Sequence, residues 1–321
     1  MPSTIEHVTR RLPPHAFFLV SAVFHYLGPA FAVLLFARVD AAGVAWLRIA
    51  SAAVVFAAWR RPWRLVAAMP WSGRRLLLGL GAVLAVMNTV FYLAIARLPL
   101  ATVGAIEFLG PIALAAAGAR SRRNAAALAT AVGGVVLLTR VRLEGQPLGF
   151  ALAFANGALF VLYVVLAHRV ARWGAGIDGL AAAMLVALVV VTPLGLAGAV
   201  PALVSPALLV AGVGVGISSS VIPYVTDQLA MARLPRATYA LLLSLLPAAA
   251  TVIGVLVLRQ LPTPLEVVGV GLVVAGVALH RDRRPHDEAG AGEISPPSGR
   301  RTRSSAAPSP DWGGRGRSPG G

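Results

Sequence analysis

The stretch Leu93-Ala94-Ile95-Ala96-Arg97-Leu98-Pro99-Leu100-Ala101-Thr102 returns later in the chain as Leu229-Ala230-Met231-Ala232-Arg233-Leu234-Pro235-Arg236-Ala237-Thr238. The spacing is 136 residues, from position 93 to position 229. Pro111 matches Pro247 and Gly118 matches Gly254 at the same spacing. A shared string with matched residues beyond it indicates two copies of one structural unit.

The composition indicates a membrane protein. The chain has 321 residues, of which 58% are hydrophobic and 12% are charged, and its mean hydropathy is +0.79. A soluble domain carries about 25% charged residues and would aggregate with so much apolar surface. A soluble enzyme and a disordered chain are therefore excluded. Cysteine is absent, which excludes a disulfide scaffold and a cysteine metal site.

Ten apolar segments approach the length of about 20 residues that a transmembrane helix needs. The second, fifth and tenth are short, and the first is too long for a signal peptide. The segments are 16–36, 41–59, 76–96, 100–119, 125–139, 147–167, 177–200, 206–230, 237–258 and 264–280. The sequence therefore predicts an all-α membrane protein with ten transmembrane helices.

The matched stretch joins the third and fourth helices of each five-helix set. Because five is odd, the two sets cross the membrane in opposite senses, and inverted repeats are typical of secondary transporters. The first repeat is expected over 16–139 and the second over 147–280, with a linker over 140–146. Residues 1–15 form a cytoplasmic segment in this reading. Residues 281–321 are rich in Pro, Gly, Ser and Arg and are predicted to be a disordered basic tail.

The arginines set the expected orientation. All 28 basic residues are arginine, and with the N-terminus inside, 14 lie in inner segments and 5 in outer ones, the tail and Arg48 left aside. Arginine marks the cytoplasmic side, so both termini are expected in the cytoplasm of a bacterial inner-membrane protein. The clusters stand between apolar runs, a pattern that argues against nucleic-acid binding. The tail is expected near anionic lipids of the bilayer.

Four ionisable side chains fall within the predicted spans: His25, Arg48, Glu107 and Asp227. Each costs at least about 2.5–3.5 kcal/mol at the helix centre, so a partner or a wet cavity is expected. Glu107 is a candidate for holding a substrate ammonium or a proton, and Arg48 for a substrate carboxylate. A structural pair between the two that locks helices together is the alternative.

The other two groups are candidates for coupling. His25 is a possible proton relay because imidazole titrates near neutral pH, and Asp227 lies near a helix end where it can reach water. Three further acids, Asp40, Asp178 and Glu266, lie at helix ends where solvation is easy, and they are assigned no role.

Four prolines are predicted to interrupt helices, because proline removes the hydrogen bond to the carbonyl four residues earlier. They are Pro29, Pro111, Pro223 and Pro247, which free the carbonyls of His25, Glu107, Ser219 and Leu243. Broken helices at membrane depth are tolerated where they line a cavity.

Several polar side chains in the spans are candidates for lining the transport path. Asn88, Tyr92 and Tyr224 are included in the predicted site, and others are Asn156, Tyr163, Ser218, Ser219, Ser220 and Ser244. Each of them also fits a plain hydrogen bond between helices.

Absent motifs narrow the function. There is no Walker loop and no H-E-x-x-H, so neither an ATP motor nor that zinc site is expected, and no cofactor or metal is predicted. An intramembrane serine hydrolase is not expected either, because the sequence contains no G-x-S-x-G motif. A channel would show rings of repeated polar residues. The chain is therefore expected to be a transporter and not an enzyme.

Several motifs resemble the EamA-type carriers of the drug/metabolite transporter superfamily, above all the bacterial threonine/homoserine exporters. They are Met87-Asn88-Thr89-Val90-Phe91-Tyr92-Leu93, Leu98-Pro99-Leu100 and Ala105-Ile106-Glu107-Phe108-Leu109-Gly110-Pro111, with Leu47-Arg48-Ile49-Ala50, Pro223-Tyr224, Asp227 and Arg233-Leu234-Pro235. The resemblance runs over residues 16–280. It implies ten helices in two EamA repeats and efflux of small metabolites by exchange for protons.

The chain departs from the family pattern at two places. The family has an acid before the second matched proline, where this chain has Leu246, and Gly-Glu at the end of the ninth helix, where it has Arg259-Gln260. Glu107 is then expected to carry more of the coupling. The predicted function is export of small amino acids such as threonine and homoserine, with protons as the coupling ion, and efflux of drug-like or hydrophobic metabolites is the alternative.

Overall fold

The computed structural model describes residues 13–118, 121–140, 146–171, 173, 175–231, 233 and 245–279. Every regular element in these ranges is a helix. The predicted tail, residues 1–12, most of the linker and the first part of the ninth predicted span lie outside them. The elements are α2 (Pro14–Leu35), α3 (Ala41–Arg60), α4 (Trp63–Ala68), α5 (Trp71–Ile95), α6 (Leu100–Gly118), α7 (Arg122–Arg140), α8 (Pro147–Ala171), α9 (Gly176–Leu203), α10 (Pro206–Gly216), the π-helical turn η1 (Ile217–Val221), α11 (Ile222–Met231), α13 (Leu246–Leu258) and α14 (Pro264–Leu279).

Six helices in the described ranges are long and apolar enough to cross a membrane: α2, α3, α5, α8, α9 and the continuous run from α10 through α11. Shorter apolar helices lie within α6, α13 and α14. Apolar side chains such as Leu19, Val189 and Val210 are exposed on the outside of the helices. An outer surface of this kind suits lipid, because exposed apolar groups cost free energy in water.

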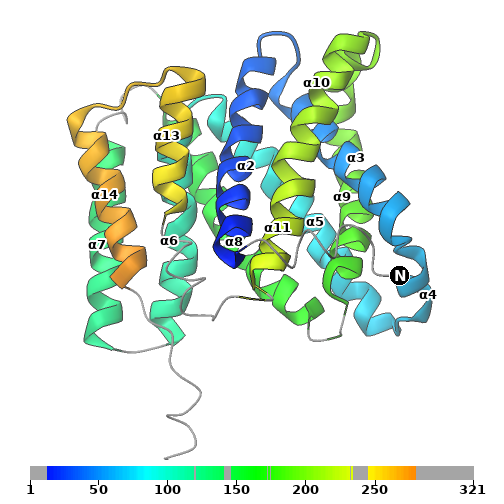
Figure 1. Ribbon diagram of the computed structural model, residues 1–321, viewed down its shortest axis with the longest axis horizontal. Helices are drawn as coiled ribbons and strands as arrows, with labels where there is room; N and C mark the ends of the chain where they lie inside the picture. The colour runs from blue at the N-terminus through cyan, green and yellow to red at the C-terminus, as the bar shows by residue number, and fades with distance from the viewer. Residues whose placement is uncertain are drawn as a thin grey trace, which may run out of the picture. The chain divides into compact units, whose positions relative to one another are not determined.

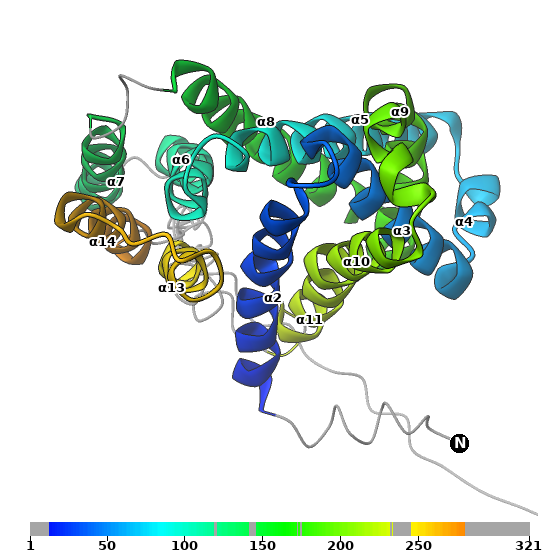
Figure 2. The same cartoon turned by 90° about the horizontal axis from the view of Figure 1, so that it is seen from above.

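The helices pack in a regular pattern of neighbours (Figures 1 and 2). In one group, α7 lies against α14 and α6 against α13, and in the other, α3 lies against α9. Between the groups, α2 contacts α11 and α13, and α8 contacts α5 and α6. Helices from the two halves of the sequence are thus interleaved throughout the described bundle.

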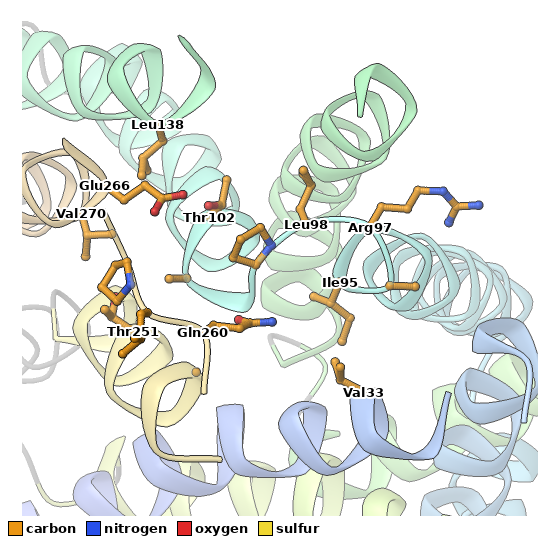
Figure 3. A pocket seen from close by; sticks show the side chains of 16 residues that line it. Val33, Ile95, Arg97, Leu98, Thr102, Leu138, Thr251, Gln260, Glu266 and Val270 are labelled. Atoms are coloured by element: carbon orange, nitrogen blue, oxygen red, sulfur yellow. The ribbon is translucent and has the colours of Figure 1, made fainter. Parts of the chain in front are cut away.

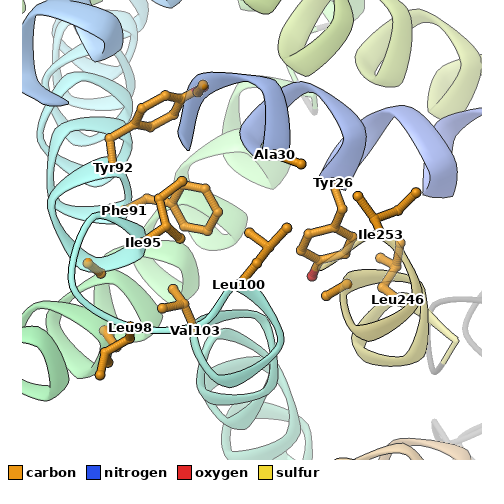
Figure 4. Packing of buried hydrophobic residues seen from close by; sticks show 14 of the residues in the cluster. Tyr26, Ala30, Phe91, Tyr92, Ile95, Leu98, Leu100, Val103, Leu246 and Ile253 are labelled. Atoms are coloured by element: carbon orange, nitrogen blue, oxygen red, sulfur yellow. The ribbon is translucent and has the colours of Figure 1, made fainter. Parts of the chain in front are cut away.

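Two apolar clusters form the interior. The first joins α2, α6 and α13 with the end of α5, and Figure 4 shows Tyr26, Leu100 and Ile253 within it. The second lies between α3, α5 and α9, around Phe56 and Met184.

The backbones of α3 and α9 are in close contact where the two helices cross. A Cβ atom on Gly43 would overlap the carbonyl group of Gly198, and one on Gly195 would overlap the carbonyl oxygen of Ala42. Only glycine lets the two backbones approach this closely, which is the usual way helices associate in lipid, where lipid tails remove the hydrophobic driving force. The same device joins α7 to α14 through Gly134 and Gly269.

Three features of the fold were not anticipated from the sequence. The short helix α4 occupies the arginine-rich connection between the second and third predicted spans. The π-helical turn η1 interrupts the eighth span. The helix-end acids also have partners: Asp40 accepts from the backbone N–H of Ala42 at 3.0 Å, and Glu266 accepts from that of Thr263 at 2.8 Å. Such caps satisfy N–H groups that the first turn of a helix leaves free.

Candidate functional site

Arg48 is buried in the middle of α3, with 7% of its surface exposed. Its Nε donates to Ser220 Oγ at 3.0 Å and its Nη2 donates to the carbonyl oxygen of Ser219 at 3.1 Å. Two directed bonds to one helical turn fix the plane of the guanidinium, as the forked donor set of arginine allows. Arg48 thus joins α3 to η1.

Pro223 explains why the carbonyl of Ser219 is free to accept a hydrogen bond from Arg48. Pro223 has no N–H, so the carbonyl of Ser219 loses the donor that an unbroken α-helix would supply. In η1 the backbone N–H of Ile222 bonds instead to the carbonyl of Ile217, five residues earlier. Arg48 supplies a donor to the Ser219 carbonyl. π-Helical turns of this kind occur frequently at functional sites.

Tyr92 completes the surroundings of Arg48. The guanidinium carbon lies 5.4 Å from the centre of the fully buried Tyr92 ring, within the range of a cation–π interaction. The Tyr92 hydroxyl lies 3.5 Å from Ser219 Oγ. Gly28 of α2 packs directly on Ser219, since a Cβ atom there would overlap the serine side chain. Four elements, α2, α3, α5 and η1, therefore meet at this cation.

Glu107 is buried in α6, with 6% of its surface exposed. Its Oε1 accepts a hydrogen bond from Asn156 Nδ2 of α8 at 3.1 Å. Gly157 follows Asn156, and a Cβ atom there would lie 3.3 Å from the carbonyl oxygen of Ile106, so α8 passes close to α6 at this point. The acid is therefore held by a helix of the other half of the sequence.

Two buried polar atoms near Glu107 have no hydrogen-bond partner in the described part of the chain. They are the hydroxyl oxygen of Tyr26 and Oδ1 of Asn156, and both residues are fully buried. The Tyr26 hydroxyl lies against α6, 3.0 Å from where a Cβ atom on Gly104 would stand. Gly104 is three residues before Glu107, so the two positions share one face of the helix.

Arg48 and Glu107 make no ion pair with each other. The hydrogen bonds of Arg48 run to Ser219 and Ser220, and that of Glu107 comes from Asn156. A buried cation and a buried acid that each bond to other groups, and not to each other, are suited to binding the two ends of a zwitterion, or a proton at the acid.

Three of the other predicted residues have contacts in the described structure. The His25 ring packs edge-on against Tyr26, with 5.1 Å between ring centres. Tyr224 is partly buried and packs against the second apolar cluster. Asn88 is buried but donates to the Leu84 carbonyl of its own helix at 2.7 Å.

The four prolines occupy different helical settings. Pro29 lies inside α2, which continues to Leu35, and Pro247 lies in the first turn of α13. Pro111 lies within α6, and Pro223 directly follows η1 and the first residue of α11. Only at Pro223 does the described structure give the freed carbonyl, that of Ser219, a new side-chain donor.

Tyr26 was absent from the sequence-based site, and Asn156 was noted only as a polar position. A tyrosine next to a histidine in an apolar segment reads as a packing residue. The signal that distinguishes Tyr26 is its contact with Gly104, which lies 78 positions further along the chain, from 26 to 104, and no local pattern encodes it.

A separate cavity of about 430 Å³ opens between the ends of α5, α6, α13 and α14 (Figure 3). Polar and charged residues that line it are Arg97, Thr102, Thr251, Gln260 and Glu266. Gln260 Oε1 accepts from the backbone N–H of Leu100, the first residue of α6, at 3.1 Å. The connection before α14 therefore caps α6 at the rim of this cavity.

Comparison with known proteins agrees with this architecture. The profile of the EamA-like transporter family matches residues 147–281. The threonine/homoserine exporter RhtA of Escherichia coli (strain K12) is 32% identical over 272 residues, covering 83% of this chain and 91% of RhtA. RhtA of Salmonella typhimurium (strain SL1344) is 32% identical over 273 residues, covering 83% of this chain and 92% of RhtA.

The fold is similar to that of a solved crystal structure, with a TM-score of 0.56 at 21% identity, over 83% of this chain and 97% of that chain. The relatives are exporters, and the apolar helices make this chain a multi-pass cell-membrane protein of the same kind. The chain belongs to the EamA-like transporters of the drug/metabolite transporter superfamily, near the threonine/homoserine exporters.

Proposed function

We propose that the protein is an alternating-access exporter of small amino acids, built from two inverted five-helix repeats over 16–139 and 147–280. The helix neighbours support the repeat. In this repeat α2 corresponds to α8, α5 to the α10–α11 run, and α6 to α13. The contact of α2 with α11 then corresponds to that of α8 with α5, and the contact of α2 with α13 to that of α8 with α6. The pairs α3–α9, α6–α13 and α7–α14 map onto themselves. Such exchange symmetry is what a pseudo-two-fold repeat requires.

The observation that carries the proposal is the way the two buried charges bridge the halves. Arg48 of the first repeat is held by Ser219 and Ser220 of the second, and Glu107 of the first by Asn156 of the second. If the repeats rock against each other, these bonds open and close with the motion. A substrate that replaces them couples its own binding to the change of state, because a ligand shifts a conformational equilibrium by its differential affinity.

The substrate class follows from the two charges together. Amino acids such as threonine and homoserine carry a carboxylate, which suits Arg48, and an ammonium, which suits Glu107. The exporters that this chain resembles are named for these substrates. Protons are the proposed coupling ion, since a buried carboxyl group can alternate between an ionised and a protonated form in the two states. The arginine distribution supports an inner-membrane orientation with both termini cytoplasmic.

The test is efflux of labelled threonine and homoserine from loaded cells that express the wild type or Glu107→Gln. Glutamine keeps the shape of the side chain but cannot ionise, so we expect efflux from wild-type cells and none above background from the variant. Thr130→Val is a suitable control, because Thr130 lies on α7 and bonds only to its own helix. Wild-type cells that match empty cells, with the protein present in the membrane, would exclude these amino acids and favour drug-like or hydrophobic metabolites.

A further inference from the structure

The buried polar atoms near Glu107 that lack a hydrogen-bond partner indicate a binding site for a ligand. Buried polar atoms without a partner are rare, and leaving one costs about 1–3 kcal/mol. Here two of them, Tyr26 Oη and Asn156 Oδ1, belong to fully buried side chains beside the same acid. Two such costs at one place are expected where a third molecule supplies the missing bonds.

The geometry directs these atoms toward one face of α6. Asn156 donates through Nδ2 to Glu107 Oε1, which fixes its amide plane next to the carboxylate and leaves Oδ1 as a neighbouring acceptor. The Tyr26 side chain reaches from α2 toward α6 and α13 (Figure 4), and its oxygen lies over Gly104, one turn before Glu107. The lack of a side chain at Gly104 leaves room for that oxygen.

The shared chemistry of the three groups is hydrogen-bond acceptance. The carboxylate and the amide oxygen only accept, and the phenol oxygen can accept. A primary ammonium offers three N–H donors and no acceptor, which complements this set. A carboxylate or a phosphate would instead face the negative charge of Glu107 and leave the acceptors unpaired.

We propose that Tyr26, Asn156 and Glu107 form a recognition site for a primary ammonium group, so that the exported molecule must carry an unsubstituted primary amine. This inference rests on the proposed function in one respect: it concerns recognition of the amino group of the same exported substrate. Methylating the nitrogen twice removes two of its three donors and adds bulk. Sites built to hydrogen-bond a group discriminate strongly against analogues that lack it, because their own buried polar groups are then left unpaired.

The test uses two matched pairs of probes on the full-length protein in lipid nanodiscs: L-homoserine with N,N-dimethyl-L-homoserine, and 2-phenylethylamine with N,N-dimethyl-2-phenylethylamine. Binding is measured by calorimetry. We expect the primary amine of at least one pair to bind at least about tenfold more tightly than its dimethyl counterpart, the ratio for loss of one hydrogen bond to a charged group. Equal affinities within both pairs, or no binding of any of the four, would overturn the proposal.

The outcomes separate this proposal from amino-acid export. Equal affinities within both pairs, with homoserine bound, would leave amino-acid export standing and exclude the ammonium site. Discrimination within the phenylethylamine pair, with neither homoserine form bound, would leave the ammonium site standing and exclude export of this amino acid.

Two variants connect the preference to the named residues. Tyr26→Phe removes only the hydroxyl and Asn156→Leu removes only the amide, and each is expected to reduce the primary-amine preference at least severalfold. Thr130→Val should retain the full preference. A Tyr26→Phe and an Asn156→Leu protein that both fold, bind and discriminate like the wild type would show that a water satisfies these atoms, which would also overturn the proposal.

Discussion

Arg60 Nε donates to Asp178 Oδ1 at 2.6 Å, which joins the last residue of α3 to the first turn of α9. At the other end of the same helix pair, Asp40 precedes α3 and lies against Gly198 of α9. The positions correspond, because 138 residues separate both Asp40 from Asp178 and Arg60 from Gly198. At one end of the α3–α9 pair the helices are thus in close contact at a glycine, and at the other end an ion pair joins them.

Breaking this ion pair is expected to alter transport more than stability. Both side chains are about a third exposed, at 36% and 37%, and exposed pairs contribute about 0.2–1 kcal/mol. Arg60→Ala should therefore shift the melting temperature by a few degrees at most. The pair links α3 and α9 across the two proposed repeats, so the efflux rate should change severalfold. A double-mutant cycle with Asp178→Asn, read in efflux, checks this, and additive effects of the two changes would contradict it.

The close contact at Gly198, at the other end of the α3–α9 crossing, should contribute more to the stability of the protein than the ion pair does. Gly198→Ala adds a methyl group against Asp40, whose Oδ2 would lie 3.0 Å away, and against the Gly43 backbone. Overpacking costs about 1–3 kcal/mol, so the melting temperature in detergent should fall by several degrees. Gly271→Ala is the matched control, because a Cβ atom on Gly271 of α14 meets nothing within 4 Å. Equal melting temperatures for the two variants would show that α3 and α9 are not tightly packed there.

Replacing Arg48 by lysine should strongly reduce efflux although the positive charge is kept. Arg48 uses two nitrogens for the Ser219 carbonyl and for Ser220 Oγ, and a single ammonium cannot reproduce that planar fork. We expect efflux to fall at least tenfold, with protein levels in the membrane unchanged. Arg74→Lys provides the comparison, since Arg74 bonds to the carbonyls of Met69 and Ala67 outside the site. A fully active Arg48→Lys protein would show that only the positive charge matters.

The sequence predicted the helical segments and most of the polar residues because both are local properties. Long apolar runs mark helices wherever they pack, and Arg48 and Glu107 stand out because charges are rare in such runs. The pairing of those charges was not predictable, since Arg48 binds a serine turn 171 and 172 positions away. The proline rule identified the freed Ser219 carbonyl, but only the crossing of α3 with η1 reveals its donor. Asp178 was likewise expected to be a solvated helix-end acid, because its partner Arg60 is 118 positions away in the sequence.

The capping of α6 by Gln260 gives a last prediction. Leu100 begins α6, and its backbone N–H is one of the donors that a helix start leaves free. Gln260 Oε1 accepts from it at 3.1 Å. Gln260→Glu keeps an acceptor and adds a negative charge at a helix N-terminus, which stabilises by about 0.3–1 kcal/mol, whereas Gln260→Leu removes the cap at a cost of about 0.5–2 kcal/mol. The melting temperatures should therefore rank Glu, Gln, Leu from highest to lowest. A glutamate variant less stable than the leucine variant would show that the side chain serves the adjacent cavity and not the helix.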